Sequence, residues 1–249
     1  MALLEVNQVS KHFGGLVANQ EVSFALEQHE MLGLIGPNGA GKTTLFNCIA
    51  GFYPVTSGRI IFDGRDITAL RDYQTARLGL ARTFQIFQAS GDLKVLENVM
   101  VGSFLRTGSR RKARQTAEGC LDFLGIRAAA GAMMADLPVA AQKRVALATA
   151  LASDPKLMLL DEVGAGLNKS EIEGLVALLR RIHSERGIAL LLTEHVLEMV
   201  MALSHRVIVL ESGRKIAEGE PAAVVKDPEV IRAYLGDHYI RRRQETKDA

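Results

Sequence analysis

A glycine-rich stretch that ends in lysine and threonine is the part of this sequence best suited to chemistry. It reads Gly36-Pro37-Asn38-Gly39-Ala40-Gly41-Lys42-Thr43, with Thr44 next. This spacing matches the phosphate-binding pattern G-x-x-x-x-G-K-[ST]. Glycines let backbone N–H groups approach phosphate oxygens without a Cβ atom in the way, and the N-terminus of a following helix adds partial positive charge. The stretch therefore predicts a site for a nucleoside triphosphate.

The residues around this loop supply the structural context that the pattern requires. Residues 31–35 form a short apolar run typical of a buried strand, and residues 44–50 indicate a helix closed by a glycine. We expect Lys42 to reach the β- and γ-phosphates of the nucleotide, Thr43 to ligate Mg²⁺, and Thr44 to donate to the α-phosphate. A glycine turn with an incidental lysine is the weaker alternative.

Two acidic residues follow a second buried strand. Residues 157–160 are four consecutive apolar residues, which suits a parallel strand buried on both faces, and Asp161 and Glu162 come directly after them. Asp161 can hold Mg²⁺ beside Thr43, directly or through water. Glu162 can act as general base on the attacking water, or orient it. The alternative is an acidic pair that merely ends a strand.

A glutamine and a histidine complete the candidate set. Gln85 lies between the predicted core and a helical stretch, and its neutral amide can sense Mg²⁺ and the γ-phosphate without adding charge. His195 closes a predicted buried strand, where it can hydrogen-bond the γ-phosphate and sense its loss. Taken alone, a glutamine at this position would not indicate a functional site, and a lone histidine is more often a structural residue.

The elements that must position these residues change in kind along the chain. Residues 3–9 alternate and predict an edge strand, while residues 59–62 followed by Asp63 and Gly64 predict a hairpin, so the chain starts as antiparallel sheet. From about residue 93 to residue 152 the strand signals vanish and apolar residues recur at helical spacing. Alternating strands and helices resume after this helical insertion.

Composition and charge narrow the class of protein. The chain has 249 residues, 30 basic and 28 acidic, with a net charge of +2, so no overall field argues for nucleic acid. Cys48 and Cys120 lie in apolar, helix-like runs and are expected to be reduced core thiols of a cytosolic protein. The N-terminus lacks the pattern of a signal peptide, and no apolar run approaches the ~18 residues that span a bilayer. Any membrane role is expected to come through a partner.

Taken in order, these residues resemble the nucleotide-binding subunits of ABC transporters. The resemblance runs from Leu4 to about Gly236. It rests on Phe13, the phosphate loop, Gln85, the Asp161-Glu162 pair, Ala165-Gly166-Leu167-Asn168 and His195.

The resemblance implies a fold and a division of the chain. The family fold is an α/β P-loop NTPase core of RecA-like type, with an antiparallel β subdomain and an inserted helical subdomain. We therefore expect one domain over residues 1–240, with a charged tail over 241–249. Within the domain, the core is expected at 1–88 and 153–240, and the helical subdomain at about 89–152.

The resemblance also implies individual roles. Phe13 is similar to the aromatic residue that stacks on adenine, the alternative being a core phenylalanine. Gln85 is similar to the glutamine that couples nucleotide state to the membrane subunits. Residues 165–168 resemble the D-loop, which crosses to the other subunit, and His195 resembles the switch histidine.

The partners implied by the resemblance are proteins of a membrane complex. They are a homologous ATPase subunit in a head-to-tail dimer, integral-membrane permease subunits and, indirectly, a solute-binding protein, with no nucleic acid. A peripheral position at the cytoplasmic face of the cell membrane follows. A soluble ABC ATPase acting on DNA or ribosomes would need a long coiled-coil insertion or two cassettes in one chain.

A narrower resemblance is to the LivG-type ATPases of branched-chain amino-acid importers. It rests on several short sequence segments, which are Phe13-Gly14-Gly15-Leu16, Phe46 to Tyr53, Ala81 to Gln85, Ala165 to Asn168, and Ile231 to Gly236. We expect the chain to bind and hydrolyse ATP for an importer of branched-chain or related amino acids. Importers of amides or urea stay open.

One motif departs from the family. The signature, usually L-S-G-G-Q, reads Leu137-Pro138-Val139-Ala140-Ala141. Pro138 has neither a hydroxyl nor an N–H, and Ala140 places a Cβ where the family has glycine. In the family this motif clamps the γ-phosphate held by the opposing subunit. We therefore expect a heterodimer with unequal sites, with a low-turnover nucleotide-binding subunit as the alternative.

Overall fold

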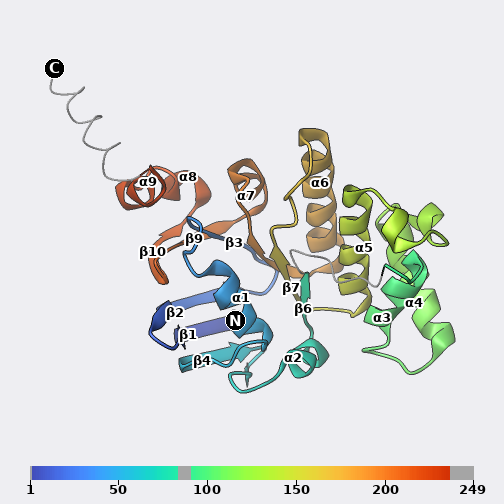
Figure 1. Ribbon diagram of the computed structural model, residues 1–249, viewed down its shortest axis with the longest axis horizontal. Helices are drawn as coiled ribbons and strands as arrows, with labels where there is room; N and C mark the ends of the chain where they lie inside the picture. Colours follow the sequence, from blue (N-terminus) through green and yellow to red (C-terminus); the bar gives the residue numbers. More distant parts are fainter. Residues whose placement is uncertain (1, 84–90, 236–249) are drawn as a thin grey trace.

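Two β-sheets organise the protein, whose computed structural model describes residues 2–83 and 91–235 (Figure 1). The larger sheet has the order β10-β9-β3-β8-β7-β6, and only β10 runs antiparallel to its neighbour. Alternate residues of β7 belong to two separate apolar cores, so this sheet is covered on both faces, as the apolar run 157–160 predicts. Its strands are β3 (Met31–Ile35), β6 (Leu80–Thr83), β7 (Leu157–Asp161), β8 (Ala189–Thr193), β9 (Arg206–Glu211) and β10 (Arg214–Gly219).

The smaller sheet is antiparallel and has the order β2-β1-β4-β5. The β4–β5 hairpin at Asp63-Gly64 is confirmed, but the prediction of an edge strand over residues 3–9 is wrong, because β1 pairs with β2 on one side and with β4 on the other. Alternating burial reports which face of a strand is covered, not whether its backbone edges are paired. The strands are β1 (Ala2–Phe13), β2 (Leu16–Glu27), β4 (Ser57–Phe62) and β5 (Arg65–Asp66).

Helix α1 (Lys42–Ala50) packs between the two sheets. Leu45, Phe46 and Ile49 are fully buried in a core that also holds residues of β1, β4, β7 and β8. Gly51 ends the helix in the left-handed conformation, φ 85°, as glycine can without steric cost. Because α1 is held from both sides, the loop that precedes it has a rigid base. The α/β class with a separate antiparallel sheet is confirmed.

The remaining helices cover the larger sheet and extend it to one side. In Figure 1, α3, α4 and α5 gather on the side of the molecule away from the β1–β2 hairpin. They fall within the segment predicted as a helical insertion, while the subdomain limits stay a prediction. In the described part of the chain, no helix combines the length and apolarity needed to cross a membrane. The helices are α2 (Asp72–Leu78), α3 (Val95–Ser103), α4 (Arg110–Phe123), α5 (Val139–Ala152), α6 (Lys169–Arg186), α7 (Leu197–Leu203), α8 (Pro221–Val224) and α9 (Pro228–Leu235), with 3₁₀ turns η1 (Arg127–Ala129) and η2 (Met134–Asp136).

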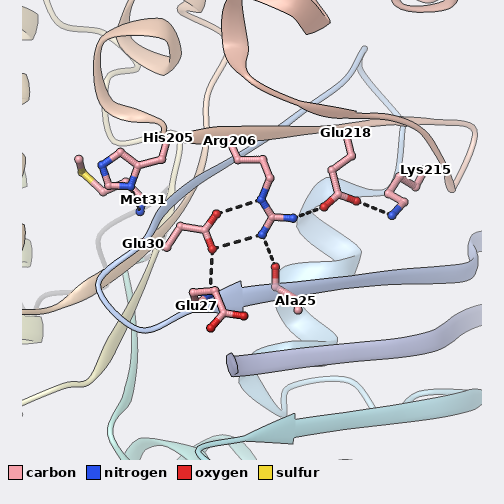
Figure 2. Close-up of polar contacts among 8 residues, drawn as sticks. All are labelled: Ala25, Glu27, Glu30, Met31, His205, Arg206, Lys215 and Glu218. Carbon is pink, nitrogen blue, oxygen red and sulfur yellow. Dashed lines mark hydrogen bonds and ion pairs between the residues drawn. The ribbon is translucent and has the colours of Figure 1, made fainter. Parts of the chain in front are cut away.

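An arginine at the start of β9 ties the two sheets together. Figure 2 shows Arg206 between the Glu30 carboxylate, with N···O distances of 3.0 and 3.2 Å, and the carbonyl of Ala25 in β2. Glu218 of β10 accepts a further bond from Arg206 and pairs with Lys215. Glu30 precedes β3 and Arg206 begins β9, so this network lies at the amino ends of the parallel strands.

The crossing of α3 and α5 generates a stability prediction. A Cβ added at Gly102 would lie 2.0 Å from the Thr149 carbonyl oxygen. Gly102→Ala should therefore destabilise the protein by about 1–3 kcal/mol through overpacking, measured by urea unfolding. In the control Gly119→Ala, no atom lies within 4 Å of the added carbon, and the helix gains up to ~1 kcal/mol of propensity. Equal effects of the two changes would contradict the close crossing.

Candidate active site

The predicted site residues gather at the carboxyl ends of three neighbouring parallel strands. Gly36 follows β3, Asp161 ends β7, and His195 comes two residues after β8, in a sheet where β8 lies between β3 and β7. Ligands of open α/β sheets bind at this edge, because loops converge there and helix N-termini point toward it. The arrangement brings together residues that lie more than a hundred positions apart in the sequence.

The loop between β3 and α1 requires its glycines. Gly41 has φ 97°, and a Cβ there would lie 2.3 Å from the Ala18 carbonyl oxygen. A Cβ at Gly36 would lie 2.2 Å from the Leu210 carbonyl oxygen. Larger residues would thus push the loop away from β2 and β9. The loop that results is a tight turn leading directly into the N-terminus of α1, which suits the binding of an anion.

Lys42 is held inside this loop. Its side chain is largely buried, and its ammonium donates to the carbonyl oxygens of Gly36 at 2.6 Å and Pro37 at 3.0 Å. Burial lowers the pKa of Lys42, while the nearby carboxylates of Glu162 and Asp161 act in the opposite direction. Thr43 is exposed and Thr44 is half-buried. The loop thus combines a cation, two hydroxyls and backbone donors.

Asp161 is almost completely buried and accepts two strong hydrogen bonds. Thr193 Oγ1 of β8 donates to it at 2.7 Å, and Arg82 Nη2 of β6 donates at 2.8 Å. Arg82 also donates to Asn47 of α1, and both partners of the ion pair are shielded from water. Arg82 was not among the site residues predicted from the sequence. A charged residue within a short, mostly buried strand, three positions before Gln85, is the signal that marks it.

Glu162 and His195 form a pair beside Asp161. Nε2 of His195 and Oε1 of Glu162 are hydrogen-bonded at 2.7 Å. Glu162 has a left-handed backbone, φ 50°, which is rare outside glycine and is held here by a bond from its own N–H to the Thr193 carbonyl at 2.9 Å. The His195 side chain is about half exposed, at 46 %. The pair can therefore face a substrate while its backbone is fixed.

Phe13 lies at the surface and not in the core. Its side chain is 42 % exposed, and its ring packs edge-on against Tyr53 with a centroid distance of 5.4 Å. The Lys11 ammonium lies 4.8 Å from the Phe13 ring centroid and donates to the Pro54 carbonyl oxygen. An exposed aromatic ring held by neighbours is suited to stacking on a base. Tyr53, which was not among the predicted site residues, supports the ring.

The two segments expected to contact another subunit are exposed. Pro138 is the N-cap of α5, and the side chain of Val139 is 55 % exposed. In the D-loop, Ala165 and Gly166 are exposed, while Asn168 accepts from the Glu171 N–H and caps α6. Gln85 lies outside the described residues.

The donor set fits a nucleotide with Mg²⁺. Among the residues described, no three or more His, Cys, Asp or Glu side chains gather into a metal cluster. Mg²⁺ usually takes one or two protein oxygens and completes its shell with phosphate and water, so Thr43 and Asp161 suffice beside a bound triphosphate.

Comparisons with known proteins show the family of this chain. The ABC transporter profile matches residues 19–165, and a profile described as branched-chain amino acid ATP-binding cassette transporter matches residues 214–240. The high-affinity branched-chain amino acid transport ATP-binding protein BraF of Pseudomonas aeruginosa is 35% identical over 94% of this chain and 98% of its own length. LivG of Escherichia coli K12, with the same description, is 36% identical over the same shares.

Solved structures match over the same extent. A nucleotide-free ATP-binding cassette from an ABC transporter has a TM-score of 0.87 and 29% identity, covering 95% of this chain and all of that one. An ATP-binding cassette of an ABC transporter in its ADP conformation has a TM-score of 0.86 and 29% identity, again over 95% of this chain.

The Arg82–Asp161 pair generates a second prediction. Arg82→Met leaves the Asp161 carboxylate buried with one donor fewer, and breaking a buried pair in this way costs about 3–5 kcal/mol. Urea unfolding of the variant should show a loss of that order. The double variant Arg82→Met with Asp161→Asn should recover most of it, because no uncompensated charge remains. If Arg82→Met alone costs less than about 1 kcal/mol, the pair is worth no more than a surface ion pair.

Proposed function

This chain belongs to the ATP-binding proteins of ABC transporters and is an ATPase, and we propose that it energises an importer of branched-chain or related amino acids. The observation that carries the proposal is similarity to BraF and LivG along nearly the whole of all three chains. The match of residues 214–240 to a branched-chain amino acid transporter profile supports the same solute class. The alternative is an importer of amides or urea, which uptake measurements with labelled solutes would distinguish.

In the proposed site, the chain binds ATP with the phosphate loop and Phe13. Phe13 stacks on adenine from its position beside Tyr53, while backbone N–H groups of residues 36–43 surround the β- and γ-phosphates. Lys42 exchanges its carbonyl acceptors for phosphate oxygens, which are better partners for an ammonium because they carry charge. Thr44 donates to the α-phosphate.

Thr43 and Asp161 are proposed to hold Mg²⁺, together with Gln85. The ion neutralises charge on the β- and γ-phosphates when it is bound. Arg82 and Thr193 orient the Asp161 carboxylate through the bonds described above, and they leave it lone pairs for a water or a metal ion.

Glu162 is proposed to act on the attacking water. Its carboxylate accepts a proton from the attacking water, or orients that water. The water oxygen forms a bond to the γ-phosphorus while the bond from that phosphorus to the β–γ bridging oxygen breaks, which releases ADP. His195 donates to a γ-phosphate oxygen and reports its loss. The 2.7 Å contact between His195 Nε2 and Glu162 Oε1 supports placing both side chains at one reacting group. When ATP binds, the Nε2–H would exchange this acceptor for a γ-phosphate oxygen.

The chain is proposed to pair head-to-tail with a homologous ATPase subunit. In such a dimer each nucleotide lies between one phosphate loop and the other subunit's signature. The exposed start of α5 supports this role, and Pro138 supports a heterodimer, since it cannot donate a backbone or hydroxyl hydrogen bond. The site built on Lys42, Asp161 and Glu162 is then the competent one.

The permease is proposed to dock in a cleft between the sheet and the helices. A cavity of about 650 Å³ lies between α2, β6, α3 and α5. Phe52, Tyr73 and Val101 line it with side chains that are 40–58% exposed, which supports an apolar segment as the partner. Docking there places the chain at the cytoplasmic face of the membrane and links it indirectly to a solute-binding protein.

Replacement of Glu162 tests the ATPase and the solute together. In cells lacking this chain, the native form should restore ATP-dependent uptake of labelled leucine. Glu162→Gln should not, since the amide keeps the shape but accepts no proton. Purified Glu162→Gln should retain ATP binding and lose at least about 10²-fold in steady-state hydrolysis.

Glu173→Gln is the matched control, because Glu173 is an exposed carboxylate on α6. It should hydrolyse ATP at the native rate. If the native chain restores uptake of urea or an amide but not of leucine, the proposed solute is wrong. If Glu162→Gln hydrolyses ATP at the native rate, Glu162 does not have the proposed role.

The altered signature gives a separate prediction about pairing. Pro138→Ser with Ala140→Gly should raise ATPase of the chain paired with itself at least tenfold, because one preorganised donor is worth about 10²–10³ in rate. Pro138→Ala, which restores an N–H but no hydroxyl, should give a smaller gain. In the assembled transporter, Glu162→Gln in this chain should nearly abolish turnover, while the matching change in the partner should cost little. Equal losses from the two would contradict unequal sites.

A further inference from the structure

A buried carboxylate that the proposed chemistry does not use lies next to the Glu162–His195 pair. Glu194 is 3% exposed and directly precedes His195. Its Oε1 accepts from the Gly164 N–H at 2.8 Å, and the carboxylate also accepts from the His195 N–H. One side chain thus joins the loop that carries Glu162 to the loop that carries His195.

The loop after β7 needs such a contact. Glu162 is left-handed, and a non-glycine residue in that region costs about 1–3 kcal/mol that its surroundings must hold. Two consecutive residues at the end of β8 supply the restraint: the Thr193 carbonyl accepts from the Glu162 N–H, and Glu194 accepts from the Gly164 N–H. The backbone is therefore restrained by hydrogen bonds both at Glu162 and two residues after it.

The fit around Gly164 is tight. A Cβ at that position would lie 3.2 Å from Glu194 Oε2 and 3.1 Å from the Met199 sulfur. A Cβ there would require the ends of the Glu194 and Met199 side chains to shift by a few tenths of an ångström.

Charges on other elements face the same carboxylate. Burial raises the pKa of Glu194 to about 7, bonds from the Gly164 N–H and the charge of Lys143 lower it, and Glu162 raises it further. Lys143 belongs to α5, and its ammonium donates to the Glu162 carbonyl oxygen at 3.4 Å. Burial also lowers the pKa of Lys143. The helix that begins with the signature is thereby attached to the same loop.

We propose that Glu194 is a positioning residue for ATP hydrolysis, whose carboxylate locks the 162–164 loop to the end of β8 and so sets the geometry of the Glu162–His195 pair. The inference rests on the proposed function, because it assigns a supporting role to the same site. Glu194 itself touches neither substrate nor metal. Its loss should misplace Glu162 relative to the water and leave the phosphate loop unchanged.

The test compares Glu194→Ala and Glu194→Gln in the assembled transporter, purified through this chain, with Glu198→Ala as control. Glu198 is an exposed carboxylate four residues further along, on α7. Glu194→Ala should lower kcat by about 10²-fold, the cost of a displacement on the scale of 1 Å, with ATP affinity within twofold of native. At pH 8 Glu194→Gln should give a kcat between those of the native protein and Glu194→Ala, because its amide oxygen still accepts from Gly164 but carries no charge to strengthen the bond. Glu198→Ala should match the native protein.

The pH profile separates positioning from a purely structural role. Above a pKa of about 7 Glu194 is ionised and its bonds to the two N–H groups are charge-assisted, so kcat of the native complex should fall as pH drops through 7. The Glu194→Gln profile should lack this step. The groups facing Glu194, which are Lys143, Glu162 and His195, are common to both proteins, so the difference between the profiles isolates Glu194.

Several outcomes would overturn the inference. They are an unchanged kcat in Glu194→Ala, a loss of ATP affinity equal to the loss of kcat, or identical pH profiles for the native and Glu194→Gln complexes. If Glu194→Ala fails to fold, the Glu194→Gln profile decides alone. Failure of the proposed function would be seen separately, as a native rate of ATP hydrolysis in Glu162→Gln. If only the role of Glu194 is wrong, Glu162→Gln is still inactive.

Discussion

The buried carboxylate of Asp161 is the group on which the arrangement of the site depends. It accepts from Thr193 and Arg82, and Arg82 also reaches Asn47, so one negative charge connects β7 with β8, β6 and α1. Removing an ionised carboxylate from water costs several kcal/mol unless donors replace the lost hydration. These elements therefore have to keep their relative positions for the charge to be tolerated. The same charge is the one proposed to hold Mg²⁺.

The loops at the strand ends accommodate a left-handed backbone in two ways. Gly41 takes a left-handed backbone at no steric cost, and the lack of a Cβ lets it pass against Ala18. Glu162 is left-handed with a full side chain, and it is held there by the end of β8. A glycine at position 162 would relax the backbone but could not take a proton. The chemistry requires the carboxylate, so tertiary contacts carry the strain.

The residues that this chain contributes to the two proposed nucleotide sites differ in kind. Lys42, Asp161 and the Glu162–His195 pair lie together at one edge of the sheet, with partners that orient them. The start of α5, by contrast, presents Pro138 and an exposed Val139 where a donor is expected. Lys143, one turn further along α5, contacts Glu162 from within the same chain. The helix that begins with Val139 is therefore in direct contact with the loop that carries Glu162.

Local sequence determined the phosphate loop, the β4–β5 hairpin and the buried β7, because each depends on neighbours in the chain: glycine spacing, turn residues and a continuous apolar run. The resemblance to ABC transporter subunits, which the comparisons confirm at the level of the family, also came from short local motifs. Local sequence does not specify which strands pair with one another. For that reason β1 was predicted to be an edge strand, although it lies between β2 and β4.

Only the tertiary structure assigned partners to Arg82, Glu194 and Tyr53. Arg82 meets Asp161 across 79 positions, and Glu194 meets Gly164 across 30. No periodicity or motif encodes such contacts, because they depend on the order in which β6, β7 and β8 lie side by side. Sequence specified which groups could do chemistry, whereas the desolvation and hydrogen bonding that hold them in place arise only when distant strands pack together.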